Sequence, residues 1–344
     1  MGGVMKQKPG LIFFIGLLLL SLFSFFLLSF LFKSPIPQGE MYRIGILLSG
    51  PERLDKVRGF IDGMRALGFV EGVDYRVILR DSQNDQEKMK EDADELDGMG
   101  LDLIATGGAI ETQAFQGKKE GKTPILFMGV ADAVQLKLVE RYGRPGGRIT
   151  GLENGHVDLS GKRLQLLKLL LPSVRRVVVL YDKRVDASLL ALKKVQEVAE
   201  RESIPLFPIS ISNKQQLKRF QDDMFKNGDA LLLLPSYYLE EISPRLAEIA
   251  LKKGLPLFGL YENDVRNGFL LSYGISYYDQ GYQCAKMASQ LLHSQDPSTL
   301  PVETPETVKL LVNPETEQAL HLTFSPAGEA FVERIRMDQE KGGE

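Results

Sequence analysis

The sequence is poor in the residues that build disulfides, metal sites and basic surfaces. Its 344 residues include one cysteine, Cys284, so no disulfide can form within the chain. Cys284 has no neighbouring histidine and lies in a helix-like segment, where we expect a small buried apolar residue and not a reactive thiol. The net charge of −3 argues against nucleic acid as a partner, because binding a phosphate backbone requires a basic surface.

The motifs of common enzymes are also missing. No G-x-G-x-x-G follows a strand-like run, and no G-x-S-x-G is present. The three histidines, His156, His293 and His321, lie far apart without the spacing of zinc ligands. The carboxylates between residues 81 and 97 lack the pattern of a calcium loop and are typical of a solvated helix face. We therefore expect no catalytic residues, no metal and no cofactor.

One long apolar run stands near the start of the chain. Residues 11–32 carry no charge, and as a helix of about 22 residues they would rise about 33 Å, enough to span a membrane. Lys6 and Lys8 precede the run, which places the start of the chain in the cytoplasm and everything after Lys33 outside. The prediction is a single-pass protein of the inner or cytoplasmic membrane with an extracytoplasmic, periplasmic domain.

A cleavable signal peptide is the alternative for residues 1–33. Its apolar region would be shorter and would end in a small-x-small cleavage site, whereas Ser29-Phe-Leu-Phe-Lys-Ser-Pro35 follows here. We favour an uncleaved anchor, joined to the rest of the chain by a linker at 34–41. The absence of a cysteine near residue 33 excludes a lipoprotein anchor.

Strand-like and helix-like patterns then alternate in two sets. The first set has strands near 42–49, 75–80, 101–106 and 125–129 and helices near 54–67, 86–99 and 109–119; the second has strands near 176–180, 206–210, 230–235 and 256–260 and helices near 159–170, 188–202, 214–226 and 239–253. Such alternation predicts parallel sheets flanked by helices. The fold class is therefore α/β with two Rossmann-like lobes.

Several ordered blocks carry a resemblance to a known family. They are Arg144-Pro-Gly-Gly-Arg-Ile-Thr-Gly-Leu152, Ser160–Pro172, Arg175–Tyr181, Leu271-Ser-Tyr-Gly274, Leu300-Pro-Val-Glu303 and Leu310-Leu-Val-Asn313. Together they resemble the substrate-binding proteins of ABC importers, the family that includes the TrpX-like amino-acid binders. The resemblance extends over nearly everything from Tyr42 to Pro326.

The resemblance implies the type I periplasmic-binding-protein fold, whose two lobes are joined by a three-segment hinge. The crossings fall near residues 150, 272 and 304, which gives a first lobe of 42–150 plus 272–303 and a second of 151–271 plus 304–327. The charged tail, 328–344, is expected to fray. The implied function is capture of a small ligand and its delivery to an ABC permease and ATPase. The alternative is a ligand-sensing ectodomain that signals to a membrane partner.

Candidate ligand contacts follow the strands of the first lobe, because ligands bind at the carboxyl ends of parallel strands. They are Ser49, Thr106, Gly107, Gly108 and Asp132. The glycine pair would let backbone N–H groups reach a ligand carboxylate, and a tight turn without a ligand is the alternative. The resemblance implies a glycine pair at this place in the family, so we favour ligand contact. Asp132 is suited to a ligand ammonium, to capping the following helix, or to both.

The corresponding positions in the second lobe are rich in tyrosine. They are Tyr181, Asp182, Ser236, Tyr237, Tyr261 and Glu262. Aromatic rings with hydroxyls at the rim of a cleft suit an aromatic or aliphatic amino acid or a similar small molecule. Packing within the lobe is the alternative for each tyrosine.

Overall fold

The computed structural model describes residues 41–117, 121–218, 220 and 224–335. The predicted membrane segment at 11–32, the linker up to residue 40 and residues 336–344 lie outside this range. Among the helices of the described range, none is long and apolar enough to cross a membrane.

The first lobe is built on a parallel sheet of five strands in the order β2-β1-β3-β4-β5. The strands are β1 (Tyr42–Leu48), β2 (Tyr75–Asp81), β3 (Leu103–Thr106), β4 (Ile125–Val130) and β5 (Ile149–Glu153). Every residue of β3, β4 and β5 is buried. Such continuous burial is expected where helices cover both faces of a parallel sheet.

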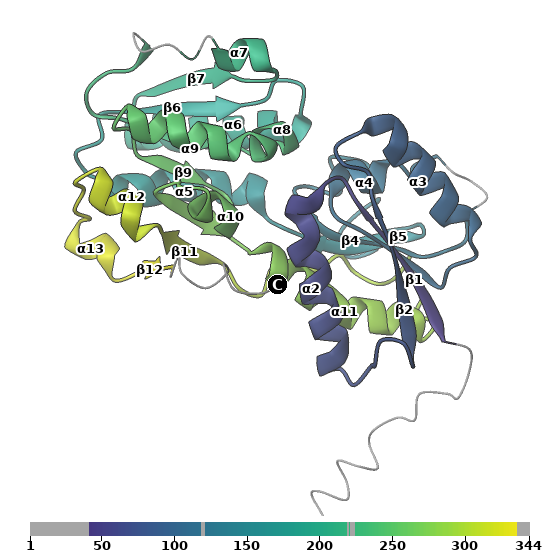
Figure 1. Cartoon of the computed structure of the whole chain (residues 1–344). Coiled ribbons are helices and arrows are strands. Elements are labelled where there is room, and N and C mark those ends of the chain that lie inside the picture. The colour runs from purple at the N-terminus through teal and green to yellow at the C-terminus, as the bar shows by residue number, and fades with distance from the viewer. Residues whose placement is uncertain (1–40, 118–120, 219, 221–223, 336–344) are drawn as a thin grey trace, which may run out of the picture. The chain divides into compact units, whose positions relative to one another are not determined.

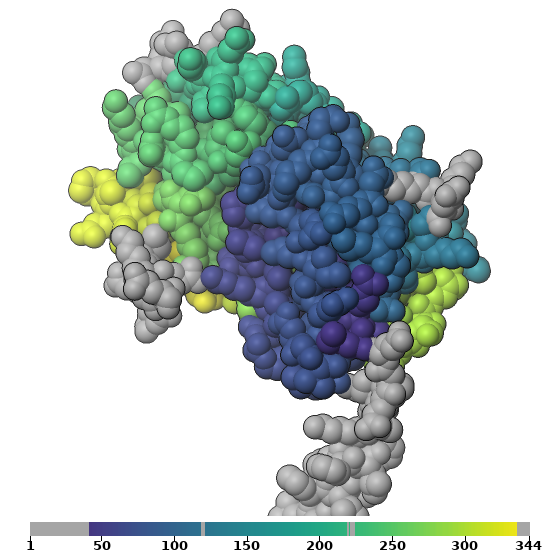
Figure 2. All heavy atoms as spheres, turned by 45° about the vertical axis from the view of Figure 1, so that its right-hand side comes forward, coloured from purple at the N-terminus to yellow at the C-terminus, as the bar shows by residue number. Residues whose placement is uncertain are grey.

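Four helices cover this sheet. They are α2 (Leu54–Ala66) and α11 (Tyr277–Leu292) on one face and α3 (Gln86–Gly98) and α4 (Ala109–Gln113) on the other (Figure 1). Met89 and Leu96 of α3 pack in one core with Leu47 and Phe127 of the strands. In the space-filling view, the atoms of this part of the chain, in blue, form a continuous surface (Figure 2).

Helices α2 and α11 touch through their backbones, although more than two hundred residues separate them in sequence. A Cβ added at Gly59 would lie 1.9 Å from the carbonyl oxygen of Tyr278, and one at Gly281 would lie 1.8 Å from that of Lys56. Neither position has room for a side chain. The glycines therefore fix how closely the two helices pack, and with it the position of Lys56.

The second lobe is built on a sheet of seven strands in the order β12-β11-β10-β9-β8-β6-β7. They are β6 (Arg176–Tyr181), β7 (Leu206–Ser210), β8 (Asp229–Leu233), β9 (Leu257–Gly259), β10 (Leu271–Gly274), β11 (Lys309–Val312) and β12 (Glu333–Arg334). All neighbouring pairs are parallel except β10 and β11.

Alternate residues of each strand enter different cores of the second lobe, as a side-chain period of two requires. Val177 and Val179 pack with residues of α5 (His156–Leu170) and α6 (Asp186–Glu202), whereas Val178 and Leu180 pack with those of α8 (Tyr237–Glu241) and α9 (Ser243–Lys252). The remaining described helices are η1 (Pro51–Arg53), α7 (Lys214–Lys218), α10 (Glu262–Arg266), α12 (Pro314–Ala319) and α13 (Pro326–Glu329).

The chain passes between the two lobes at three places. It leaves the first sheet after β5 and enters α5, returns after β10 into α11, and passes back between residues 303 and 309 into β11. Glu303 pairs with Leu152, so the first and third passages run side by side. Arg163 of α5 donates from Nε to the carbonyl oxygen of Tyr273 at 2.8 Å, which joins the first passage to the second.

Residues 328–335, the described part of the expected charged tail, contact the second lobe. Strand β12 pairs with β11, and Arg334 forms ion pairs with Glu317 and Glu329. The backbone of Gly328 lies against Leu170. These contacts hold the chain on the second lobe through residue 335, because the side chains that look like a solvated tail in the sequence find partners on α12 and α13.

Candidate functional site

A cavity of about 260 Å³ lies where the carboxyl ends of the strands of both sheets converge. Its first-lobe wall includes Arg53, Lys56 and Gly108, and its second-lobe wall includes Arg184, Tyr237 and Tyr261. These residues follow strands or lie in the first turn of the next helix. The cavity therefore occupies the place where open α/β sheets bind ligands.

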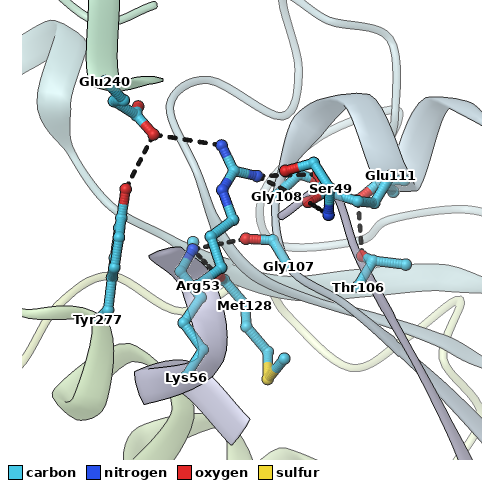
Figure 3. A network of polar contacts seen from close by, with 12 residues as sticks. Ser49, Arg53, Lys56, Thr106, Gly107, Gly108, Glu111, Met128, Glu240 and Tyr277 are labelled. Carbon is cyan, nitrogen blue, oxygen red and sulfur yellow. Dashed lines mark hydrogen bonds and ion pairs between the residues drawn. The ribbon is translucent and has the colours of Figure 1, made fainter. Parts of the chain in front are cut away.

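The first-lobe wall contains a buried ion pair. Arg53 Nη1 donates to both carboxylate oxygens of Glu111, at 2.8 and 2.9 Å, and Glu111 also accepts the backbone N–H of Ser49 at 2.8 Å (Figure 3). Glu111 is completely buried. Burial raises the pKa of Glu111, but the Arg53 guanidinium, the backbone hydrogen bonds and Lys56 together outweigh burial, so the pKa lies below its usual value. The pair therefore stays ionised inside the protein.

Lys56 is a second buried cation of this wall. Its Nζ donates to the carbonyl oxygens of Gly107 at 2.5 Å and Met128 at 2.6 Å, and it lies 4.8 Å from the ring centre of Tyr277 (Figure 3). Burial, with the nearby Arg53 cation, lowers the pKa of Lys56 to about 7. The ends of β3 and β4 are thereby joined through one side chain.

The glycine pair after β3 makes room for the guanidinium. A Cβ at Gly108 would lie 2.5 Å from Arg53 Nη1, and one at Gly107 would lie 2.9 Å from Leu48 and 3.0 Å from Glu111. Gly108 has extended backbone geometry, so the space and not an unusual conformation explains the glycine. The pair therefore serves the ion pair, and Gly108 also lines the cavity.

Glu240 of α8 reaches from the second lobe to the first. Its Oε2 accepts a hydrogen bond from Tyr277 Oη at 2.8 Å and forms an ion pair with Arg53 Nη2 at 3.3 Å (Figure 3). Burial opposes the positive charge of Arg53, but Glu111 and Glu240 hold its pKa above the ordinary value. Charges from both lobes thus meet at one side of the cavity.

The second-lobe wall is organised from behind by Asp182. This fully buried carboxylate accepts from the backbone and side chain of Arg184, from Ser212 Oγ at 2.5 Å and from Ser236 Oγ at 3.4 Å. Burial raises the pKa of Asp182, but the hydrogen bonds from Arg184 and Ser212 bring it below the usual value. Asp182 thereby holds Arg184 and Ser236 at the cavity.

Helix α6 begins at the same wall. Val185 and Ala187 line the cavity, and no described side chain caps the first N–H groups of the helix. The amino-terminus of a 17-residue helix carries partial positive charge. Together with Arg184, it offers a place for a ligand anion.

Aromatic rings form the apolar part of the site. Tyr261 lines the cavity, and its ring lies 4.5 Å from that of Tyr277 and 4.4 Å from that of His156, centre to centre. Tyr237 adds a half-buried ring on the second lobe. Burial, then the nearby Glu240, raises the pKa of Tyr261, so its hydroxyl stays protonated.

The structure brings four of the predicted site residues to the cavity and places others behind its walls. Gly108, Ser236, Tyr237 and Tyr261 line it. The residues that support these from behind are Ser49, whose N–H binds Glu111; Thr106, whose hydroxyl lies 2.7 Å from that of Thr112; Gly107; and Asp182.

Three predicted residues have other surroundings in the structure. Asp132 accepts the N–H of Gln135 and the hydroxyl of Tyr142, within a turn and not at the start of a helix, so it does not serve as the expected helix cap. Tyr181 packs against the core of the second lobe, as its alternative supposed. Glu262 pairs with Arg266 within α10. None of the three lines the cavity.

Sequence reasoning missed the charged residues Arg53, Lys56, Glu111 and Glu240. Each stands three to eight residues after the end of a strand, beyond the first loop residues that were considered. The available signal was Lys56 within Leu54–Phe60, where a charged side chain occupies the apolar face of a helix.

The site contains charges of both signs and flat apolar rings around a cavity of about 260 Å³. Two lobes with such a cavity at the carboxyl ends of their strands are typical of proteins that bind a small molecule. The family model for the ABC transporter substrate-binding proteins matches residues 43–327. The chain belongs to this family of substrate-binding proteins.

Relatives and solved structures agree with this assignment. The tyrosine-binding protein of Clostridioides difficile is 24% identical over 271 residues, which cover 78% of this chain and 77% of that protein. A conserved domain protein of Vibrio cholerae superposes with a TM-score of 0.79 at 21% identity, covering 86% of this chain and all of that one. An ABC domain of Streptococcus pneumoniae in complex with L-Trp gives 0.77 at 21% identity with the same coverage. These structures share the fold.

Proposed function

We propose that the protein binds a small amino acid-like solute in the cavity between its lobes and delivers it to an ABC permease. The observation that carries the proposal is the mixture of groups around one enclosed space of about 260 Å³. A zwitterion needs a positive region, a negative region and an apolar surface, and this cavity has all three.

Each part of an amino acid has a matching group. The amino-terminus of α6 and Arg184 suit a ligand carboxylate. Asp186 suits a ligand ammonium, and Tyr237 and Tyr261 suit its side chain. The name of the tyrosine-binding relative and the L-Trp bound by a structural neighbour support the amino-acid class.

The binding mechanism needs no covalent chemistry. A ligand that contacts both lobes stabilises the closed arrangement more than the open one and shifts the population toward it. The three passages between the lobes act as the hinge. The closed form is then recognised by the permease, whose ATPase supplies the energy for import.

Location at the membrane is part of this proposal. The apolar run at 11–32 is proposed to tether the binding domain outside the cytoplasmic membrane. Mass measurement of the full-length protein purified from membranes tests it directly. An intact amino-terminus supports the tether, and a mass that lacks about the first 33 residues overturns it.

A melting-temperature screen tests the ligand class. A form that begins at Met41 is heated with L-amino acids, small peptides, nucleosides and sugars, because a ligand that binds the folded state raises the melting temperature. We expect aromatic or aliphatic amino acids to raise it and their carboxamide analogues, which lack the carboxylate, to raise it less. A flat response, or a response to sugars alone, contradicts the proposal.

A pair of adjacent variants sharpens the screen. Arg184→Ala removes a cation that lines the cavity, whereas Lys183→Ala removes an exposed cation that does not. We expect affinity to fall on the order of tenfold in the first and to stay unchanged in the second. Equal effects would contradict a carboxylate site at Arg184.

A further inference from the structure

We propose that Glu240 holds the two lobes together in the absence of ligand, so that it sets how much of the free protein is closed. The inference rests on the proposed function, since it concerns the closure that captures the solute. Glu240 is then a positioning residue for closure, and its contacts are made to the protein itself.

The contacts of Glu240 join elements that move apart when the lobes separate. Its Oε2 lies 3.3 Å from Arg53 Nη2, at the start of α2, and 2.8 Å from Tyr277 Oη, at the start of α11. Arg53 belongs to the first lobe, whereas Glu240 stands on α8 of the second (Figure 3). Tyr277 begins α11, directly after the passage from β10, and its ring also packs in a core of the second lobe. The ion pair with Arg53 is therefore the contact that crosses between the lobes, and the hydrogen bond from Tyr277 holds the same carboxylate oxygen at the passage.

Each partner has contacts that do not depend on Glu240. The guanidinium of Arg53 is fixed within the first lobe by Glu111, which is itself held by the N–H of Ser49. The ring of Tyr277 lies 4.8 Å from Lys56 Nζ of the first lobe and packs against Tyr261 of the second. Little side-chain freedom remains to be lost when Glu240 binds, so the interaction is stronger than that of two mobile surface chains.

Charge balance favours the same arrangement. The first-lobe wall contains the Arg53 guanidinium, the Glu111 carboxylate and the Lys56 amine, whose pKa of about 7 leaves it only partly protonated at neutral pH. Glu240 supplies a second carboxylate from across the cavity. Separating the lobes would remove this carboxylate from Arg53, and a partly buried charge is destabilised when its partner is removed.

Burial separates this pair from ordinary surface ion pairs. The side chains of Arg53 and Glu240 are 8% and 11% exposed, whereas those of the Arg245–Glu248 pair are 64% and 65% exposed. Solvent and salt weaken the second kind of pair far more than the first. The Glu240 contacts should therefore persist at physiological ionic strength.

The test measures the distance between the lobes of the full-length protein in detergent, without any ligand. Spin labels are placed at Lys90→Cys on α3 and Lys193→Cys on α6, both exposed positions, while the native Cys284 is fully buried. We expect a mainly short distance for the parent. Glu240→Gln should raise the open fraction about fivefold or more, and Tyr277→Phe, which loses one hydrogen bond and keeps the ring, about twofold.

Glu241→Gln is the matched control, because Glu241 is the exposed neighbour of Glu240 on the same helix. Its distance distribution should equal that of the parent, and urea unfolding should show that all variants remain folded. An unchanged distribution in Glu240→Gln overturns the inference. So does a parent that is already mainly open, because then nothing holds the lobes together.

Titration with L-tryptophan and L-tyrosine separates closure from direct ligand contact. If Glu240 acts on closure, affinity in Glu240→Gln falls only by the factor by which the closed fraction falls. A loss of a hundredfold with an unchanged distance in the free protein would make Glu240 a ligand contact and overturn the inference. Because the distances are measured without ligand, failure of both amino acids to bind counts against the proposed function alone.

Discussion

The two walls of the cavity are built on different principles. The first-lobe wall is a set of buried charges that bind one another, with Glu111 fully buried and Lys56 almost so. The second-lobe wall presents Arg184 and Tyr237, which are more exposed, and Arg184 is held from behind by Asp182. The difference teaches that a binding site can combine a fixed set of buried charges with a more adaptable surface. We call the buried charges, Arg53, Lys56, Glu111 and their partner Glu240, the charged frame. Substitutions in the two walls should therefore affect different properties.

The strongest test of the fixed frame is Glu111→Ala. It leaves the buried Arg53 guanidinium without its main partner and the N–H of Ser49 without an acceptor. We expect the free energy of unfolding to fall by about 3–5 kcal/mol, measured by urea denaturation. Glu248→Ala, which breaks an exposed ion pair, should cost at most about 1 kcal/mol. Similar losses in both would remove the distinction between buried frame and surface.

A pH test examines the edge of the same lobe. Burial, with the nearby Asp132, raises the pKa of Glu153 at the end of β5 from 4.5 to about 7. Since the folded protein holds this proton more tightly, Glu153 contributes stability below about pH 4.5 that is lost as the pH rises through about 7.

We therefore expect Glu153→Gln to gain up to about 3 kcal/mol on the parent between pH 4.5 and 8, in paired unfolding curves. Glu200→Gln, at an exposed position of α6, should follow the parent throughout. Parallel curves for Glu153→Gln and the parent would show that the buried carboxyl group does not titrate differently on folding.

Gly108→Ala tests the space for the guanidinium. The new methyl group would lie 2.5 Å from Arg53 Nη1, so the ion pair must shift. We expect a loss of about 1–3 kcal/mol in the free energy of unfolding, by chemical denaturation. Gly143→Ala is the control, because nothing lies within 4 Å of the added carbon. A neutral Gly108→Ala would mean that the frame is less rigid than the geometry indicates.

The smallest effect on stability is expected from the second wall. Tyr237→Ala should change the free energy of unfolding by less than about 1 kcal/mol, because the side chain is only half buried. Affinity for an aromatic amino acid should fall about three- to tenfold, as measured by calorimetry. Tyr282→Ala, an exposed tyrosine on α11 away from the cavity, should leave affinity unchanged. A large loss of stability in Tyr237→Ala would show that this side chain is as important for stability as the charged frame, and would contradict the distinction between the two walls.

The fold follows from the sequence more directly than the site does. Strands such as β6 and β8 are continuous apolar runs, because both faces of their sheet are covered, and that pattern is local. The same reasoning points to Gly108, Ser236, Tyr237 and Tyr261, which stand just after strands and do line the cavity.

The charged frame could not be predicted in the same way. Arg53, Lys56 and Glu240 stand in or beside helices, where charged residues are ordinarily solvated. Their burial depends on partners that are distant in the sequence: Arg53 binds a carboxylate 58 residues away and another 187 residues away. A pattern within one helix holds no information about such partners. Only the packing of both lobes reveals which charges are paired.

The close packing of α2 with α11 has a consequence for how the protein is made. The five strands of the first sheet are complete once residue 153 has left the ribosome, but α11 does not follow until residue 292. Until then the face of the sheet that α11 covers stays bare, and the glycines of α2 have no backbone to meet. Assembly of this lobe must wait for the synthesis of most of the other, which couples the maturation of the two during translation.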